Sequence, residues 1–214
     1  MKKRIIIGII VVALLVAGGL WLNYYLSFKN VTIKPAKQDM SLGVYVDDHA
    51  PEDGSEETHD KLMTVTGDQT IRLQAGSYML LPDDKTYSQS PITFTVSDSD
   101  TTVDANPAFS DEYLTSQLKN ETAEIQTLLT TTYPQLTTYT INPGRLYLDG
   151  SWYGTTMIQP SVGPGVNGEV YRTVLHKVNG KWQVAALPRL VQTKSDNKDV
   201  PESILRDLNQ QAGF

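Results

Sequence analysis

The second half of the chain holds three residues with side chains suited to contacting a small ligand: Trp152, Tyr171 and His176. Aromatic rings present apolar faces that stack on sugars and other flat ligands, and imidazole gains or loses a proton near neutral pH. The competing interpretation is that aromatic residues in strands belong to a core, which is their commoner role. His176 shares its strand parity with Val174 and Val178, which favours a packed or edge position. We name the three as candidate ligand contacts, with core packing as the favoured alternative.

A catalytic arrangement is not evident from residue types and spacing. General acid–base work by His176 would need a carboxylate or a nucleophile beside it, and the sequence names none. A Gly-x-Ser-x-Gly turn and a phosphate-binding glycine loop followed by lysine are both absent. Asp104, Asp149 and Glu169 lie in or beside expected turns, but pairing two of them would be arbitrary. We predict no catalytic residue, no cofactor and a protein that is not an enzyme.

Metal chemistry is restricted by the composition. The chain has no cysteine, which excludes disulfides, thiolate zinc sites and iron–sulfur clusters. An acidic stretch over residues 47–60 also carries two histidines, and its carboxylates are of the type that binds Ca²⁺. Its spacing does not match an EF-hand loop, so a solvated loop is the favoured interpretation. Calcium binding by this stretch stays open, and we assign no metal ligand.

The charge balance excludes one class of partner. The formal net charge is −6 at pH 7. Binding to nucleic acid through phosphates needs clustered lysine and arginine, which an acidic chain does not supply. We therefore predict no nucleic-acid partner.

The N-terminal region predicts a membrane helix. Residues 5–22 contain no charged or strongly polar side chain, and as a helix these 18 positions span about 27 Å. The basic residues 2–4 precede the run, and aromatic residues of the kind that favours a membrane interface follow it at Trp21, Tyr24 and Tyr25. We predict an uncleaved transmembrane signal-anchor helix within residues 1–29, with a cleaved signal peptide as the alternative.

This helix would set the localisation. By the positive-inside rule the N-terminus is cytoplasmic and the globular part is extracytoplasmic, so we expect a single-pass protein of the cell membrane. An exported chain without cysteine fits a bacterial envelope. The membrane is then a partner through the N-terminal helix.

Residues 30–108 predict a first domain of short strands. Apolar residues alternate with polar ones in several runs, which is typical of strands with one buried face. Turn-forming residues separate the runs, for example at Gly67-Asp68 and at residues 97–100. We predict a small antiparallel β-sandwich.

One family resemblance arises in this domain. Residues 70–80 predict a strand, a tight glycine turn and a returning strand, and they are followed by Lys85-Thr86-Tyr87 and by the strand of residues 92–96. An Asp-rich turn then precedes Thr102-Val103-Asp104. This order resembles PEGA domains, the small surface sandwiches of bacterial envelope proteins. The resemblance implies a non-catalytic envelope module.

Residues 109–214 predict a second domain of the α+β class. A helix should begin after Ser110 as N-cap and end before Pro134, because leucine and isoleucine recur at helical spacing between them. Two hairpins follow, with turns at Asp149-Gly150 and Asn179-Gly180. A last helix is expected over about 201–210, with Asp199 and Glu202 as a capping box. We predict a curved antiparallel sheet with flanking helices.

The hairpin of residues 170–184 resembles the last hairpin of NTF2-like folds. In that family a tryptophan after a glycine turn often packs into the cone, which implies a core position for Trp182 against the helix that carries Leu118, Ile125 and Leu129. The family includes enzymes, ligand binders and assembly domains, among them an inner-membrane component of type IV secretion systems. The resemblance therefore implies a fold and leaves the function open.

Three functions remain as hypotheses. The leading one is a membrane-anchored, extracytoplasmic, non-catalytic module that binds or scaffolds another cell-envelope or secretion component. The alternative is a small-ligand-binding protein that uses an NTF2-like concave pocket, with the ligand unidentified. An envelope hydrolase is the third and least favoured.

Overall fold

The computed structural model describes residues 16–47, 60–159 and 168–211. The chain divides into two compact units, the first made of Met1–Lys85 with Gln89–Pro107 and the second of Thr86–Ser88 with Ala108–Phe214. Two of the three sheets belong to the first unit and one to the second, and each unit has a core of its own. The acidic residues 48–59 lie outside the described part of the chain, and so does most of the predicted calcium-binding stretch.

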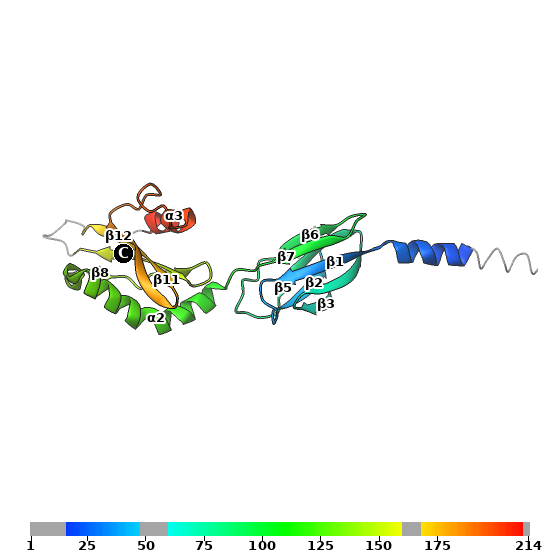
Figure 1. The fold of residues 1–214 in the computed structure, drawn as a ribbon, viewed down its shortest axis with the longest axis horizontal. Coiled ribbons are helices and arrows are strands. Elements are labelled where there is room, and N and C mark those ends of the chain that lie inside the picture. The colour runs from blue at the N-terminus through cyan, green and yellow to red at the C-terminus, as the bar shows by residue number, and fades with distance from the viewer. Residues whose placement is uncertain (1–15, 48–59, 160–167, 212–214) are drawn as a thin grey trace, which may run out of the picture. The chain divides into compact units, whose positions relative to one another are not determined.

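The predicted transmembrane helix is wrong. Within the three described ranges no helix is both long and apolar enough to cross a membrane. The helix over residues 16–26, blue in Figure 1, has eleven described residues, about 16 Å at about 1.5 Å per residue. It ends where Ser27 donates its backbone N–H to Asn23 O, and a strand begins at Phe28. The predicted positions before residue 16 lie outside the described residues.

The localisation prediction fails with that helix. The expectation of a single-pass protein of the cell membrane, with a cytoplasmic N-terminus and an extracytoplasmic globular part, depends on residues 5–22 spanning a bilayer. The same finding removes the transmembrane element from the predicted fold class.

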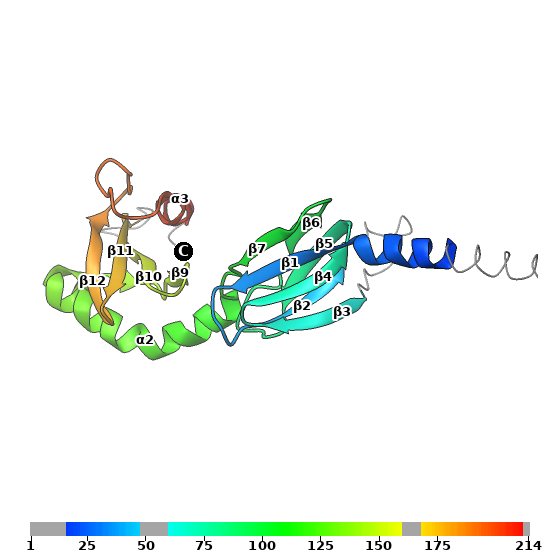
Figure 2. The same ribbon diagram turned by 45° about the vertical axis from the view of Figure 1, so that its right-hand side comes forward.

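The first unit consists of two β-sheets that form a sandwich-like arrangement (Figures 1 and 2). One sheet has the order β4-β1-β7 and the other β3-β2-β5-β6. The strands are β1 (Phe28–Pro35), β2 (Ser41–Val46), β3 (Lys61–Thr66), β4 (Gln69–Gln74), β5 (Gly76–Pro82), β6 (Ile92–Val96) and β7 (Thr101–Ala105).

The core of the first unit follows from alternation along these strands. Successive side chains point to opposite faces, so every second residue of β1 is fully buried at Val31 and Ile33. The expectation of a wholly antiparallel sandwich is wrong at one pairing, because β1 and β7 run parallel. β6 belongs to the other sheet, so the chain changes sheets between β6 and β7 before it runs beside β1.

The second unit has one sheet of order β12-β11-β10-β8, with β9 also paired to β10. Its strands are β8 (Thr140–Ile141), β9 (Arg145–Tyr147), β10 (Trp152–Ile158), β11 (Val170–Val178) and β12 (Lys181–Arg189), and its helices are α2 (Asp111–Thr132), the 3₁₀ helix η1 (Pro134–Thr138) and α3 (Glu202–Gln210).

The predicted start and end of α2 are confirmed. The Ser110 side chain accepts a hydrogen bond from Tyr113 N at 3.2 Å, and acidic residues occupy the first turn, where they favour the helix dipole. The helix ends before Pro134, which begins η1. The expected capping box of α3 is wrong: Pro201 is its N-cap residue, and no side-chain cap bond forms there.

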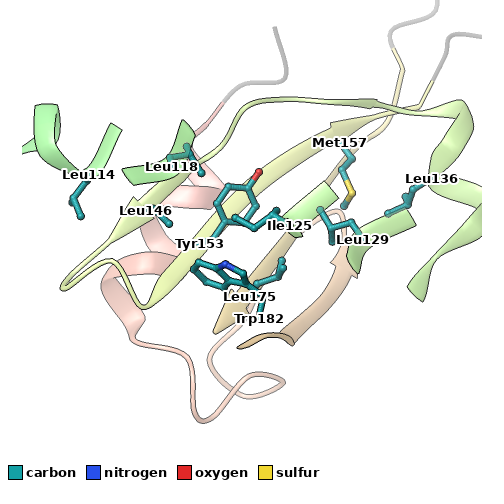
Figure 3. Close-up of a cluster of buried hydrophobic side chains, with 10 residues drawn as sticks. All are labelled: Leu114, Leu118, Ile125, Leu129, Leu136, Leu146, Tyr153, Met157, Leu175 and Trp182. Carbon is teal, nitrogen blue, oxygen red and sulfur yellow. The ribbon is translucent and has the colours of Figure 1, made fainter. Parts of the chain in front are cut away.

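Helices cover both faces of the second sheet. Leu118, Ile125 and Leu129 of α2 pack on one face, and Figure 3 shows them with Trp182 in a single cluster. Ile204 and Leu208 of α3 belong to a second cluster, which also holds Val174 and Ala186 of the sheet. β10 is buried at every position from Trp152 to Met157, as expected for a strand covered on both sides.

An irregularity in β12 changes which face its residues occupy. The register of β11 against β12 shifts around Val174, which pairs with Ala186 while Leu175 pairs with Val184. The core position of Trp182 is confirmed, with 5 % of its surface exposed. Regular alternation from Trp182 would put Ala186 on the same face, but the irregularity places Ala186 in the cluster of α3 instead.

Candidate functional site

Two of the predicted ligand contacts lie together. Trp152 and His176 are directly opposite each other on β10 and β11, and their rings stack with centroids 3.9 Å apart and planes 8° apart. Trp152 is buried in the cluster that α3 covers. Its indole therefore serves the core, and His176 is a half-buried packed residue.

Tyr171 does not join them. Alternation along β11 places it on the opposite face of the sheet from His176, five positions away. Its ring packs against the cluster of α2 and meets Tyr139 edge-on at 5.8 Å, while its hydroxyl donates to Glu169 Oε2 at 2.8 Å. The three predicted residues do not line one pocket, so a concave ligand site built from them stays a prediction without support from this arrangement.

Polar groups gather instead where α2 crosses the ends of β11 and β12. Glu121 Oε2 accepts a hydrogen bond from Trp182 Nε1 at 2.8 Å, and Glu121 Oε1 accepts one from Lys177 Nζ at 2.5 Å. The Lys177 and Glu121 side chains are 26 % and 21 % exposed. The bond from Lys177 lowers the pKa of Glu121, partial burial opposes this, and the bond from Trp182 adds to the lowering.

A pocket of about 310 Å³ lies beside this ion pair. Its walls come from the first half of α2, from the turn between β9 and β10 and from the turn between β11 and β12. They combine aromatic, charged and small residues: Phe109, Tyr113, Leu114, Gln117, Glu121, Leu146, Asp149, Gly150, Ser151, Lys177 and Gly180.

The turn between β9 and β10 brings a second carboxylate to the pocket. Asp149 Oδ1 accepts hydrogen bonds from the backbone N–H of Ser151, at 3.0 Å, and from its hydroxyl. These bonds lower the pKa of Asp149, the hydroxyl contributing most. Leu148 and Gly150 both have positive φ, 57° and 81°, so the tight turn needs the glycine that the sequence places there.

A second polar cluster links α3 to β9 and does not form an open site. Tyr147 donates its hydroxyl to Asp207 Oδ2 at 2.6 Å, and Arg145 Nη1 lies 3.6 Å from the same oxygen. Burial, and then the bond to Asp207, raise the pKa of Tyr147. A shallow pocket of about 350 Å³ adjoins these groups.

Within the described part of the chain, no three His, Asp or Glu side chains come close enough to hold a metal ion. Residues 48–59, which carry most of the predicted acidic stretch, are not among those described. Calcium binding there stays a prediction.

Sequence reasoning missed the ion pair and the pocket beside it. Glu121 and Lys177 are 56 positions apart, and no local pattern announces the pairing. One signal was present: Glu121 lies three positions after Leu118 and four before Ile125, so a carboxylate interrupts the apolar stripe of α2.

Comparisons with known proteins add little to this description. No family model matches the chain, and no curated protein matches it. The chain is similar to a DUF3823 family protein from Parabacteroides merdae ATCC 43184, whose crystal structure was determined at 1.80 Å. The identity is 13 %, the match covers 76 % of this chain and 80 % of that one, and the TM-score is 0.25. We draw no conclusion from a similarity of this size, and the PEGA-like and NTF2-like resemblances stay predictions.

Proposed function

We propose that this protein is a non-catalytic binding module that attaches to another protein through the apolar helix of residues 16–26. The observation that carries the proposal is the exposure of that helix. Its large apolar side chains are between 48 % and 67 % exposed, namely Val16, Leu20, Trp21, Leu22, Tyr24, Tyr25 and Leu26.

An apolar surface of this kind costs free energy while it faces water. A helix that is apolar on all sides is normally buried, and concentrated exposed apolar side chains mark interaction sites. Among the described residues, β4 contacts this helix at its end, where Arg72 lies over the Tyr25 ring at 4.2 Å and donates to Tyr25 O at 2.9 Å. These contacts fix the end of the helix against β4 and leave its apolar side chains available.

The chemistry of the helix defines the partner. Residues 16–26 carry no charge, and Asn23 is their one strongly polar side chain. The matching surface is therefore an uncharged apolar groove or helix of a second protein, a recognition mode in which an apolar helix lies in a groove.

Photo-crosslinking in the source cells tests the proposal. A photoreactive phenylalanine analogue at position 20 should form an adduct with one other protein, identified by mass spectrometry. The analogue at the exposed turn position Asp98 should not form that adduct. Replacing Leu22 and Leu26 by serine should abolish the adduct at position 20. An adduct only with a second copy of this chain, or no protein adduct, would overturn the proposal.

A further inference from the structure

We propose that the pocket beside Glu121 and Lys177 binds a small neutral carbohydrate. This inference does not depend on the helix of residues 16–26, because the pocket belongs wholly to the second unit.

The pocket has the size and the support of a binding site. Small-ligand pockets begin at about 300 Å³, and its volume of about 310 Å³ suits one or two sugar rings. The Glu121 carboxylate in its wall is held on one oxygen by Lys177 and on the other by the buried indole of Trp182. A wall fixed from two strands and a helix keeps its polar atoms in place before a ligand arrives, which lowers the entropic cost of binding.

The mixture of polar groups matches hydroxyls. Gln117 offers both a donor and an acceptor, Ser151 offers a hydroxyl, Lys177 donates, and Glu121 and Asp149 accept. Each sugar hydroxyl also both donates and accepts, so a polyhydroxylated ring can use such a set on several sides.

The aromatic residues supply the complementary apolar surface. Phe109 and Tyr113 line the same pocket with ring centroids 4.8 Å apart, and both are half-buried. Phe109 is also stacked on Tyr87 at 5.4 Å, which holds its ring in position. Aromatic side chains in the wall of a pocket can pack against the apolar C–H groups of a pyranose, while the polar groups bind its hydroxyls.

The charges favour a neutral ligand. The pocket carries two carboxylates and one ammonium, so an anion would meet net negative charge. A cation would compete for Glu121 with the ammonium of Lys177, which already offsets that negative charge, whereas a hydroxyl can add a hydrogen bond to either carboxylate beside its present partners. A ligand with hydroxyls and no charge avoids both penalties.

The indole N–H of Trp182 provides a reporter of binding. The chain has three tryptophans, so its ¹H–¹⁵N spectrum has three indole signals, and Trp182→Phe identifies the relevant one. Titration of the full chain with glucose, galactose, mannose or N-acetylglucosamine, to about 50 mM at constant pH, covers millimolar dissociation constants. We expect at least one of these sugars to shift the Trp182 signal saturably and to leave the Trp21 signal in place.

Two variants on α2 make the test specific. Gln117→Ala should raise the dissociation constant of the sugar at least about fivefold, which is the effect of losing one hydrogen bond. Gln126→Ala removes an exposed amide from the same helix outside the pocket lining and should leave the affinity unchanged. The proposal would be overturned if none of the four sugars shifted the Trp182 signal, including the case in which acetate, phosphate or ethylamine shifts it saturably. It would also be overturned if the two variants bound the sugar with equal affinity. Replacing Leu22 and Leu26 by serine should leave sugar binding intact, so this inference and the proposed function fail separately.

Discussion

At the scale of single residues, Trp182 joins the core of the second unit to its polar edge. Its ring is buried and meets Tyr153 edge-on at 6.3 Å, while its N–H is bonded to Glu121. A buried tryptophan needs a partner for its one donor, and a carboxylate also paired with lysine provides it. Trp182 therefore contributes to the core and also holds Glu121, which lines the proposed binding site.

Trp182→Ala should lower the free energy of unfolding of the second unit by about 3–5 kcal/mol, through lost apolar burial and the cavity left behind. Denaturant titration followed by circular dichroism measures the change. Trp21→Ala is the matched control, because Trp21 is 66 % exposed and its removal should change stability by less than about 0.5 kcal/mol. Equal effects of the two substitutions would show that Trp182 is not a core residue.

The ion pair of Glu121 predicts a dependence of stability on pH. Folding lowers the pKa of this carboxylate. Its contribution to stability is therefore complete above the pKa that it has in the unfolded chain, and is lost as pH falls through the pKa that it has in the folded protein. The second unit should therefore lose stability as pH falls below about 4.5, near the ordinary pKa of glutamate.

Glu121→Gln should reduce the loss of stability of the second unit at acid pH, that is, the acid limb of the plot of stability against pH should be shallower. Asp149 contributes in the same direction, so the informative quantity is the difference between the variant and the unmodified chain. Thermal melts between about pH 3 and pH 7 measure it. Glu124→Gln changes an exposed carboxylate on the same helix and should leave the curve as it is. An unchanged acid limb in Glu121→Gln would contradict the assignment.

At the scale of elements, periodicity predicted much of what the structure contains. The strands of the first unit follow from period-two alternation, and α2 from Ser110, the spacing of its leucines and Pro134. Alternation along one strand also puts Tyr171 and His176, five positions apart, on opposite faces, so the sequence itself argues against a single site that contains both.

Other features depend on tertiary structure and left no local signal. The parallel pairing of β1 with β7 requires knowing that β6 belongs to the other sheet. The register shift that turns Ala186 toward α3 is a partial exception, because Pro188 lies in the irregular stretch of β12 and a proline within a strand is typical of an edge or a bulge. The ion pair of Glu121 with Lys177 likewise needs α2 to cross the sheet before the two can be paired.

The N-cap of α2 allows a test at this scale. Ser110→Ala removes the acceptor for Tyr113 N and should destabilise the second unit by about 1 kcal/mol. Ser116→Ala is a matched control within the same helix, where the hydroxyl bonds to Tyr113 O and alanine is the better helix former. The melting temperature should fall in the first variant and stay the same or rise in the second. The opposite order would show that Ser110 does not cap the helix.

At the scale of the whole molecule, the second unit includes three residues from within the first half of the chain. Ser88 N donates to Ala108 O at 2.8 Å and Ser110 N donates to Thr86 O at 2.9 Å, so residues 86–88 pair with 108–110. Tyr87 is buried, with 9 % of its surface exposed, and its ring stacks on Phe109. These contacts link the stability of the second unit to a residue that the sequence places in the first predicted domain.

Tyr87→Ala should therefore destabilise the second unit, by about 2 kcal/mol or more, because it removes a buried ring and an aromatic pair. Trp152 and Trp182 both belong to the second unit and are buried, so tryptophan fluorescence follows its unfolding. The fluorescence midpoint in urea should fall in Tyr87→Ala. Val44→Ala, which truncates a fully buried residue of β2 in the first unit, is the control and should leave that midpoint in place. If Val44→Ala lowers the midpoint as much as Tyr87→Ala does, the two units do not unfold separately and the assignment of Tyr87 to the second unit loses its support.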